Sequence, residues 1–421
     1  MRLLVCTTGT QGDVQPCVAV ARGLRQAGHD VEVASATAFQ PLIEAAGLPF
    51  LRLDEPDPRR VMRDVQQGTL GQSARIRLFK HLFRRRPPPA HALARQKELC
   101  AGRDMVLSHI SNYLHLTESL GLPFVYLAAY PTLPTGSFPH HLSRIPVSLG
   151  GPLNRLTHLL FRQLFWLPDR EWVNAWRAEL GLPALGFSGP HPQAVRREVP
   201  YLFGYSPALL PRPADWPPQA EVTGFWFLDT TTSYQPPPDL LKFLDSGPPP
   251  VVMAFGSLVD PNPPELQRHL FAALEQTGQR GLVLAGWNLD QTTLPPNIFR
   301  ANWVPLPWIL PRVRAVIHHS GAGTTSEILR AAVPSVPLPY SGEQKFWGRR
   351  LHQLGLASAP LPRSKLETQP LVQRLQFVLH NSQLPERLRS MSQKLRAENG
   401  VGQAVRLIEE FASSRVKNRK S

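Results

Sequence analysis

Residues 317–327 read Ile-His-His-Ser-Gly-Ala-Gly-Thr-Thr-Ser-Glu, an apolar end followed by a turn of small residues. The run Arg314–His318 predicts a strand, and Thr325–Ala332 predicts a helix. A glycine-rich turn between a strand and a helix presents backbone N–H groups and the positive end of the helix dipole at one point. The segment therefore predicts an anion site suited to a diphosphate. Thr324 and Thr325 either donate to this site or only cap the helix.

The rest of the second half repeats this order of elements around the turn. Val251–Phe255 and Gly281–Ala285 are apolar runs that predict buried strands, and Glu265–Gly278 has the periodicity of a helix. Alternating strands and helices predict a parallel sheet with ligand-binding loops at the carboxyl ends of its strands.

The beginning of the chain has the same pattern. Leu3–Cys6 is a short apolar run, Val14–Leu24 carries a helical pattern, and Val31–Ala34 is a second apolar run. Strand, loop, helix and strand in this order again predict a parallel sheet.

A proline-rich stretch, residues 236–250, separates the two halves. The sequence therefore predicts an α/β fold of two Rossmann-like, doubly wound domains, residues 1–235 and 236–421, that face a central cleft. A cleft between such domains is the expected place for an active site.

Asp13 lies in the turn between the first predicted strand and helix. There its carboxylate has two alternative roles. It accepts the proton of a substrate hydroxyl in the cleft, or it is the N-cap of a helix that starts at Val14.

Composition limits the class of protein. Of 421 residues, 42% are hydrophobic and 18% are charged, which is typical of a globular chain. The three cysteines are an odd number at no metal-ligand spacing, so neither a disulfide framework nor a zinc site is expected. Neither a signal-peptide core nor a membrane-spanning apolar run is found, so we expect a cytoplasmic protein.

The net charge of +15 is compatible with nucleic acid, an anionic membrane or an anionic substrate as partner. No nucleic-acid-binding module is recognised, so no nucleic acid is expected. The segment Arg75–Arg86 combines basic and apolar residues at helical spacing and has no acidic residue. It predicts a basic amphipathic helix. This helix either contacts an anionic membrane from the cytoplasmic side or packs on the protein's own core with a solvated basic face.

Residues 130–235 are rich in aromatic residues, proline and glycine and show little periodicity. They predict either an irregular core or an apolar acceptor pocket walled by loops and helices. In neither case does the sequence name the acceptor.

The segment from Trp303 to Gln344 resembles the nucleotide-sugar signature of the GT-B glycosyltransferases. The resemblance is to the branch with plant UDP-glucosyltransferases, sterol glucosyltransferases and bacterial antibiotic glycosyltransferases. The family's Trp-x-Pro, His-x-Gly-x-x-Thr, helix Glu and acidic-Gln pair stand here as Trp303-Val304-Pro305, His319 to Thr324, Glu327 and Glu343-Gln344. The turn from Gly9 to Pro16 resembles the Gly-x-x-Gly-Asp-Val-x-Pro turn of sterol and antibiotic enzymes.

The resemblance assigns roles to these residues. Trp303 and Val304 are expected at the base, His319 would donate to the diphosphate, and Glu327 would accept from the ribose hydroxyls. Glu343 and Gln344 would bind the donor sugar. The remaining residues of the expected phosphate contacts are Ser257, Gly321, Gly323 and Thr324 in the second half, and Gly9, Thr10 and Gly12 near the acceptor.

The function implied by the resemblance is inverting hexosyl transfer. The donor would be a UDP-sugar or another nucleoside diphosphate sugar, and the acceptor a hydroxyl of a sterol, lipid or polyketide-like compound. Asp13 would be the base. No cofactor or metal ion is expected, because backbone donors and the helix dipole take the place of a metal.

Glu343 stands where the branch usually has Asp, which leaves the donor sugar open. One alternative is a nucleotide-dependent oxidoreductase, although Ser326 occupies the position of its third glycine. The other is a non-catalytic nucleotide-binding accessory protein, which would not need Asp13.

Overall fold

The structure is a computed structural model that describes residues 1–53, 90–143, 145, 147–229, 234–256, 258, 260, 262–284, 294–340 and 342–420. The chain divides into two compact units. Unit 1 comprises Met1–Pro207, Pro211–Leu228 and Asn399–Ser421, and unit 2 comprises Ala208–Leu210 and Asp229–Glu398. Two predicted features, Ser257 and the basic segment Arg75–Arg86, lie outside the described residues.

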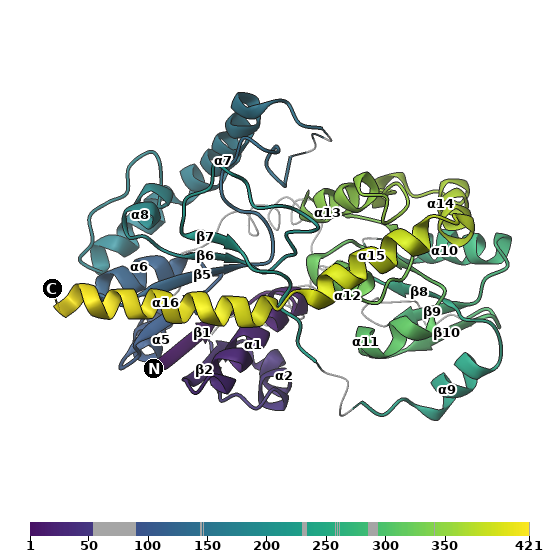
Figure 1. The fold of residues 1–421 in the computed structure, drawn as a ribbon, viewed down its shortest axis with the longest axis horizontal. Helices are drawn as coiled ribbons and strands as arrows, with labels where there is room; N and C mark the ends of the chain where they lie inside the picture. The colour runs from purple at the N-terminus through teal and green to yellow at the C-terminus, as the bar shows by residue number, and fades with distance from the viewer. Residues whose placement is uncertain are drawn as a thin grey trace. The chain divides into compact units, whose positions relative to one another are not determined.

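Unit 1 is built on a sheet of seven parallel strands in the order β3-β2-β1-β4-β5-β6-β7. Its strands are β1 (Arg2–Cys6), β2 (Asp30–Ser35), β3 (Phe50–Arg52), β4 (Met105–Ser108), β5 (Phe124–Ala128), β6 (Tyr201–Phe203) and β7 (Ala220–Val222). Its helices are α1 (Gln11–Gln26), α2 (Gln40–Ala45), α5 (Ala90–Cys100), α6 (Asn112–Ser119), α7 (Gly151–Glu179), α8 (His191–Arg196) and α16 (Gly400–Lys420). Figure 1 shows the strands and helices of this unit.

Strand β1 explains why this sheet needs helices on both faces. Leu3 and Val5 belong to the core cluster shared with α1 and α16, whereas Leu4 and Cys6 belong to the cluster shared with α5 and α6. Successive side chains of a strand point to opposite faces, so a wholly apolar strand must be covered twice.

The last helix, α16, packs against α1 within unit 1 (Figure 1). Gly23 of α1 permits the close approach, because a Cβ at this position would lie 2.5 Å from Cγ1 of Val401. Val405 and Ile408 of α16 then join the core of unit 1.

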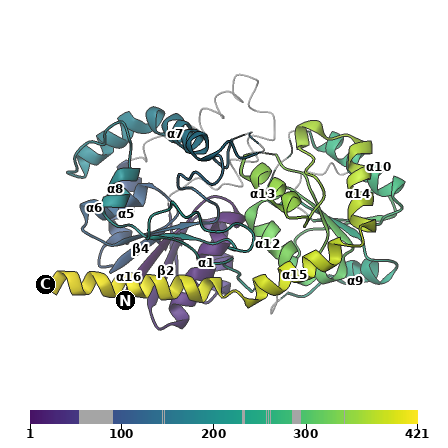
Figure 2. The same cartoon turned by 45° about the horizontal axis from the view of Figure 1, so that its top comes forward.

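Helix α7 has 29 residues, although the sequence shows little periodicity in this region. Its first half exposes a row of leucines, namely Leu153, Leu156, Leu159, Leu160, Leu164 and Leu167. In both views α7 lies at the margin of its unit (Figures 1 and 2). A row of exposed leucines on a helix of a globular protein calls for a partner surface.

Unit 2 is built on five parallel strands in the order β10-β9-β8-β11-β12. The strands are β8 (Val251–Ala254), β9 (Gly281–Leu284), β10 (Ile298–Ala301), β11 (Ala315–His318) and β12 (Ser335–Pro337). The helices are α9 (Pro238–Asp245), α10 (Pro263–Gln276), α11 (Leu306–Ile309), α12 (Ala322–Arg330), α13 (Gly342–Gln353), α14 (Thr368–His380) and α15 (Leu384–Ala397).

None of the described helices is both long enough and apolar enough to cross a membrane. Cys6, Cys17 and Cys100 are buried and form no disulfide.

Candidate active site

The strand order of unit 2 has its switch point between β8 and β11. β9 and β10 lie on one side of β8, and β11 and β12 lie on the other. At such a switch point the loops that leave the strands diverge, so the carboxyl ends of the strands frame a crevice. The turn after β11 is the segment from which the diphosphate site was predicted.

This turn is tighter than the sequence indicates. α12 begins at Ala322 and not at Thr325, and its N-cap is Gly321. Neither Thr324 nor Thr325 therefore caps the helix, which corrects the capping alternative. Ser320, before the N-cap, has a φ of 65°, a left-handed conformation that is uncommon for a residue other than glycine.

The ring of His319 is packed between two glycines. A Cβ on Gly321 would collide with Nε2 of this ring, and one on Gly256 would lie 3.3 Å from its Cε1. Nδ1 of His319 lies 3.4 Å from the carbonyl oxygen of Ala254, the last residue of β8. Burial lowers the pKa of His319 to about 4, so the free ring is neutral at pH 7. A neighbouring diphosphate would act in the opposite direction on this pKa.

Two buried hydroxyls at this turn lack hydrogen-bond partners within the described part of the chain. They are Oγ of Ser320 and Oγ1 of Thr325. Buried polar groups in native proteins are normally paired, so these two are suited to a polar ligand or a water at the turn.

Along the carboxyl edge of the sheet, the predicted donor-binding residues follow the strand order. Trp303 follows β10, His319 follows β11, and Glu343 and Gln344 lie in the first turn of α13 after β12. Neighbouring strands lie about 4.8 Å apart, so the four steps from β10 to β12 span roughly 19 Å. The aromatic ring, the anion turn and the polar pair are thus ordered as the base, diphosphate and sugar of a nucleotide sugar are.

Trp303 is suited to stacking, because its side chain is 54% exposed and is not part of the core. The rings of Tyr234 and Trp303 pack edge to face, with 5.8 Å between their centroids and 75° between their planes. Its neighbour Val304 is buried in the core of unit 2, which leaves only the backbone of Val304 for a ligand contact.

Glu327 is buried on α12, and its Oε2 accepts a hydrogen bond of 2.6 Å from Arg330. Burial raises the pKa of Glu327 to about 7, although Arg330 acts in the opposite direction. The carboxylate is therefore only partly ionised at neutral pH, which matters for any hydroxyl that donates to it.

In the first turn of α13, Gln344 is buried and its Oε1 accepts from the backbone N–H of Tyr340 at 2.9 Å. Glu343 is half-buried beside it. Gln344 thus fixes the start of the helix that carries the predicted sugar contacts.

In unit 1, the switch point lies between β1 and β4, and Asp13 lies in the first turn of α1, the helix that follows β1. The helix begins at Gln11 after the N-cap Thr10, so Asp13 is not the N-cap of a helix that starts at Val14. Its Oδ2 accepts from the backbone N–H of Thr10 at 2.8 Å and from Oγ1 of Thr10 at 2.9 Å. Within the described residues nothing donates to Oδ1, which is available to a substrate.

The two glycines of this turn differ in their surroundings. Gly9 has a φ of 101°, and a Cβ there would lie 2.7 Å from Oδ2 of Asp13. A Cβ on Gly12 would meet only Oγ1 of Thr10, at an ordinary 3.6 Å. Gly9 is therefore required for the position of Asp13, whereas Gly12 is not required on steric grounds.

Asp13 lines a small cavity of about 30 Å³ together with His109, Tyr126, Tyr130 and Trp226. His109 follows β4, and its Nε2 accepts from the backbone N–H of Thr8 at 3.1 Å. His109 was not predicted from the sequence. Its signal was a histidine directly after the apolar run Met105–Ser108, which becomes the strand next to β1.

A second feature that was not predicted from the sequence is a polar network around the buried Asp260. Asp260 accepts from the guanidinium of Arg363 at 2.6 and 2.9 Å and from the hydroxyl of Tyr340 at 2.7 Å. The network thus joins Asp260, which follows β8, to Tyr340, which follows β12, and these two strands lie on either side of β11 in the sheet.

Comparison with known proteins agrees with this geometry. A model of the glycosyltransferase family 28 N-terminal domain matches residues 3–136, and one of the erythromycin biosynthesis protein CIII-like C-terminal domain matches residues 283–404. An O-mycaminosyltylonolide 6-deoxyallosyltransferase of Streptomyces fradiae is 34% identical over 99% of this chain and 98% of its own length. A sterol 3-beta-glucosyltransferase of Arabidopsis thaliana is 30% identical over 96% of this chain.

Solved structures share the fold. The kitacinnamycin glycosyltransferase matches with a TM-score of 0.72 at 17% identity and covers 97% of this chain and 98% of its own. A spinosyn rhamnosyltransferase complexed with thymidine diphosphate matches with a TM-score of 0.62 at 19% identity, over 97% of this chain and all of its own. The two parallel sheets with their helices are thus the GT-B fold.

The chain belongs to the GT-B glycosyltransferases, in the branch of sterol glucosyltransferases and macrolide antibiotic glycosyltransferases. It spans 65% of the length of the Arabidopsis relative and 98% of the Streptomyces relative. The matches give no support to an oxidoreductase or a non-catalytic accessory protein.

Proposed function

We propose that this chain transfers a hexose from a nucleoside diphosphate sugar to a hydroxyl of an apolar acceptor, with inversion at the anomeric carbon. The observation that carries the proposal is the order of Trp303, the His319 turn and the Glu343-Gln344 pair along one sheet edge. This order fits the base, diphosphate and sugar of one extended ligand.

In the proposed reaction the acceptor oxygen attacks the anomeric carbon while Asp13 takes the hydroxyl proton. A bond forms between the acceptor oxygen and the anomeric carbon, and the bond from that carbon to the diphosphate oxygen breaks. The nucleoside diphosphate leaves with the bonding electrons. The first N–H groups of α12 and the ring of His319 stabilise its charge.

Thr10 holds Asp13 in place for this role, because its backbone N–H and its hydroxyl both donate to Oδ2. These two hydrogen bonds fix the plane of the carboxylate, and therefore also the direction of Oδ1. In-line transfer requires the acceptor oxygen within hydrogen-bonding distance of Asp13 and about 3–3.5 Å from the anomeric carbon. Glu327 is proposed to bind the ribose hydroxyls, and Ser257, Gly323 and Thr324 the diphosphate.

Asp13→Asn tests the base. Asparagine still accepts from Thr10 but cannot take a proton, so the turn is kept and only the chemistry is lost. We expect turnover to fall about 10²- to 10⁴-fold. Binding of the donor nucleotide, measured by calorimetry, and the melting temperature should stay unchanged.

Asp30→Asn is the matched control, because Asp30 is an exposed aspartate at the start of β2. It should keep full turnover. Equal turnover in Asp13→Asn and Asp30→Asn would remove Asp13 from the mechanism.

The relatives indicate which substrates to screen first. The name of the Arabidopsis relative gives a sterol as its acceptor. The name of the Streptomyces relative gives a macrolide as its acceptor and a deoxyhexose as the sugar. We propose an apolar polycyclic or macrocyclic alcohol as acceptor. A UDP- or dTDP-sugar is proposed as donor, since one solved neighbour holds thymidine diphosphate.

We also propose that the chain works in the cytoplasm and contacts an anionic membrane peripherally, where apolar acceptors are concentrated. The basic and apolar residues of Arg75–Arg86 and the exposed leucines of α7 support this. Neutralising Arg84, Arg85 and Arg86 should weaken binding to anionic vesicles and reduce its dependence on salt. If the affinity for vesicles changes neither with salt nor with these substitutions, the membrane contact through this segment is disproved.

A further inference from the structure

Unit 1 contains a second pocket, of about 320 Å³, at the opposite end of its sheet from Asp13. Phe124, the first residue of β5, lines this pocket, whereas Ala128, the last residue of β5, lines the cavity with Asp13. At about 3.3 Å per residue, β5 separates the two by roughly 13 Å. The proposed sugar transfer does not use this pocket.

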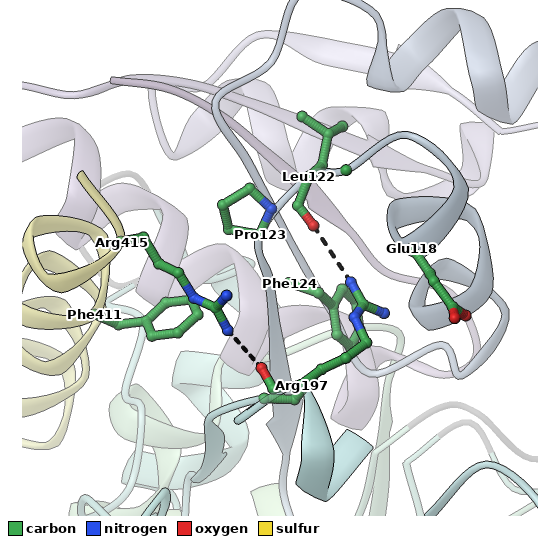
Figure 3. A pocket seen from close by; sticks show the side chains of 9 residues that line it. Glu118, Leu122, Pro123, Phe124, Arg197, Phe411 and Arg415 are labelled. Carbon is green, nitrogen blue, oxygen red and sulfur yellow. Dashed lines mark hydrogen bonds between the residues drawn. The ribbon is translucent and has the colours of Figure 1, made fainter. Parts of the chain in front are cut away.

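Two arginines line the pocket, and neither forms an ion pair with a carboxylate of the described residues. Nη1 of Arg197 donates to the carbonyl oxygen of Leu114 at 2.7 Å, and Nη2 donates to that of Leu122 at 3.4 Å. Arg415 donates to the carbonyl oxygen of Arg197. Figure 3 shows both guanidinium groups beside the loop Leu122–Phe124.

The one carboxylate on the pocket wall is already engaged. Glu118 accepts from the buried Arg177 at 2.7 Å. Burial and Arg177 lower the pKa of the adjacent His115 to about 4, so His115 is neutral at pH 7. The pocket wall thus holds two arginines and one carboxylate, and that carboxylate is already paired with Arg177, which leaves an excess of positive charge. Burial lowers the pKa of Arg197, Glu118 acts in the opposite direction, and the neighbouring Arg415 and Arg177 lower it further.

The remaining walls are apolar. Leu122, Pro123 and Phe124 come from the segment entering β5, and Phe411 comes from α16 on the facing side (Figure 3). The guanidinium of Arg415 lies 5.2 Å from the centre of the Phe411 ring. An excess of guanidinium groups over carboxylates, above an apolar wall, is complementary to an anion that carries a hydrocarbon or ring.

We propose that this pocket binds an amphiphilic anion, a carboxylate or phosphate on a small apolar body. The head pairs with Arg415 and Arg197, and the body lies against Phe124 and Phe411. The volume of about 320 Å³ is at the lower end of ligand pockets, so a short chain or a single ring system fills it. Free amphiphiles and lipids that present the same head are two sources of this chemistry.

Calorimetry of the full chain with octanoate and with octyl phosphate, below their micellar concentrations, tests the proposal. Saturating UDP is added to occupy the donor turn. We expect one further site per chain for at least one of these probes. Inorganic phosphate alone and octanol alone should bind at least tenfold more weakly. Equally tight binding of inorganic phosphate would refute the apolar part of the site, and no binding of either amphiphile would refute the site itself.

Arg415→Gln should weaken the amphiphile at least tenfold, and Arg415→Lys should weaken it less. Arg406→Gln is the control, because Arg406 is on the same helix, exposed and paired with Glu410. Unchanged binding in Arg415→Gln, or equal losses in Arg415→Gln and Arg406→Gln, would overturn the assignment. Competition by vesicles with anionic lipid, but not by neutral vesicles, would identify a lipid head as the source; without competition the source is the free amphiphile.

Discussion

At the scale of single residues, glycines fix where the polar groups of the site lie. The Cα of Gly9 is covered by the carboxylate of Asp13, and the Cα of Gly321 is covered by the ring of His319. A side chain at either glycine would push the functional group away. The sequence indicates that glycines are needed in these turns, but not which neighbour occupies the space above them.

Gly9→Ala and Gly12→Ala form a matched pair that tests this point. Alanine at position 9 must adopt a φ of 101° and displace Asp13. A displacement of about 1 Å costs roughly 10²-fold in rate, so turnover should fall by about that factor. Gly12→Ala has room and should keep turnover within a few-fold. Initial rates at saturating donor measure both. Equal rates in the two variants would contradict the steric account of Gly9.

Glu327 predicts a pH dependence of donor binding. Its pKa of about 7 lies above the ordinary value of 4.5 because the carboxyl is buried. Ribose hydroxyls donate best to the ionised form, so donor affinity should rise as the pH rises through 7. Between pH 8 and pH 6 the ionised fraction, and with it the affinity, should fall about tenfold.

Calorimetry with a nucleoside diphosphate sugar measures this dependence, because its diphosphate does not titrate in that range. Glu327→Gln should bind more weakly at pH 8 and show no such slope. The same slope in Glu327→Gln would show that another group is responsible.

At the scale of elements, the sequence predicted the alternation of strand and helix and five of the strands, namely β1, β2, β8, β9 and β11, because these are short apolar runs between turns. It did not predict the other described strands. It missed the starts of α1 at Gln11 and α12 at Ala322. In both cases small residues in the first helical turn have the composition of a loop. His109 was not predicted, because the sequence of one strand does not reveal which other strand lies next to it in the sheet.

Helix α7 was missed for a different reason. Its core-facing positions are mixed with polar residues such as Asn154 and His158, and its exposed positions are leucines. The usual polar and apolar faces are thus exchanged in its first half. If the apolar residues of such a helix are assumed to be buried, its sequence shows no regular apolar face, and the helix is not predicted.

The exposed leucines of α7 should contribute to membrane binding. Replacing Leu156, Leu160 and Leu164 by glutamine removes apolar surface that would enter the bilayer. The affinity for anionic vesicles should fall by about tenfold per leucine. Co-sedimentation with vesicles measures it.

Ala175→Gln and Ala178→Gln, at exposed positions in the other half of α7, are the control and should leave vesicle binding unchanged. If the folded leucine variant binds vesicles as tightly as the wild type does, the exposed leucines have another partner.

At the scale of the whole molecule, each unit carries one part of the proposed chemistry at the switch point of its own sheet. Asp13 follows β1 in unit 1, and His319 follows β11 in unit 2. The repeated strand and helix pattern in the sequence predicted both sheets. The acceptor could not be predicted, because the side chains that line the cavity beside Asp13 come from loops and strands far apart in the sequence.

The most direct measurement is a crystal structure of the protein with a nucleoside diphosphate bound. We predict the diphosphate on the N–H groups of Gly321, Gly323 and Thr324, the base against Trp303, and Asp13 opposite the place of the sugar. A nucleotide bound elsewhere, or an Asp13 too far from it for one acceptor hydroxyl to reach both, would contradict the account.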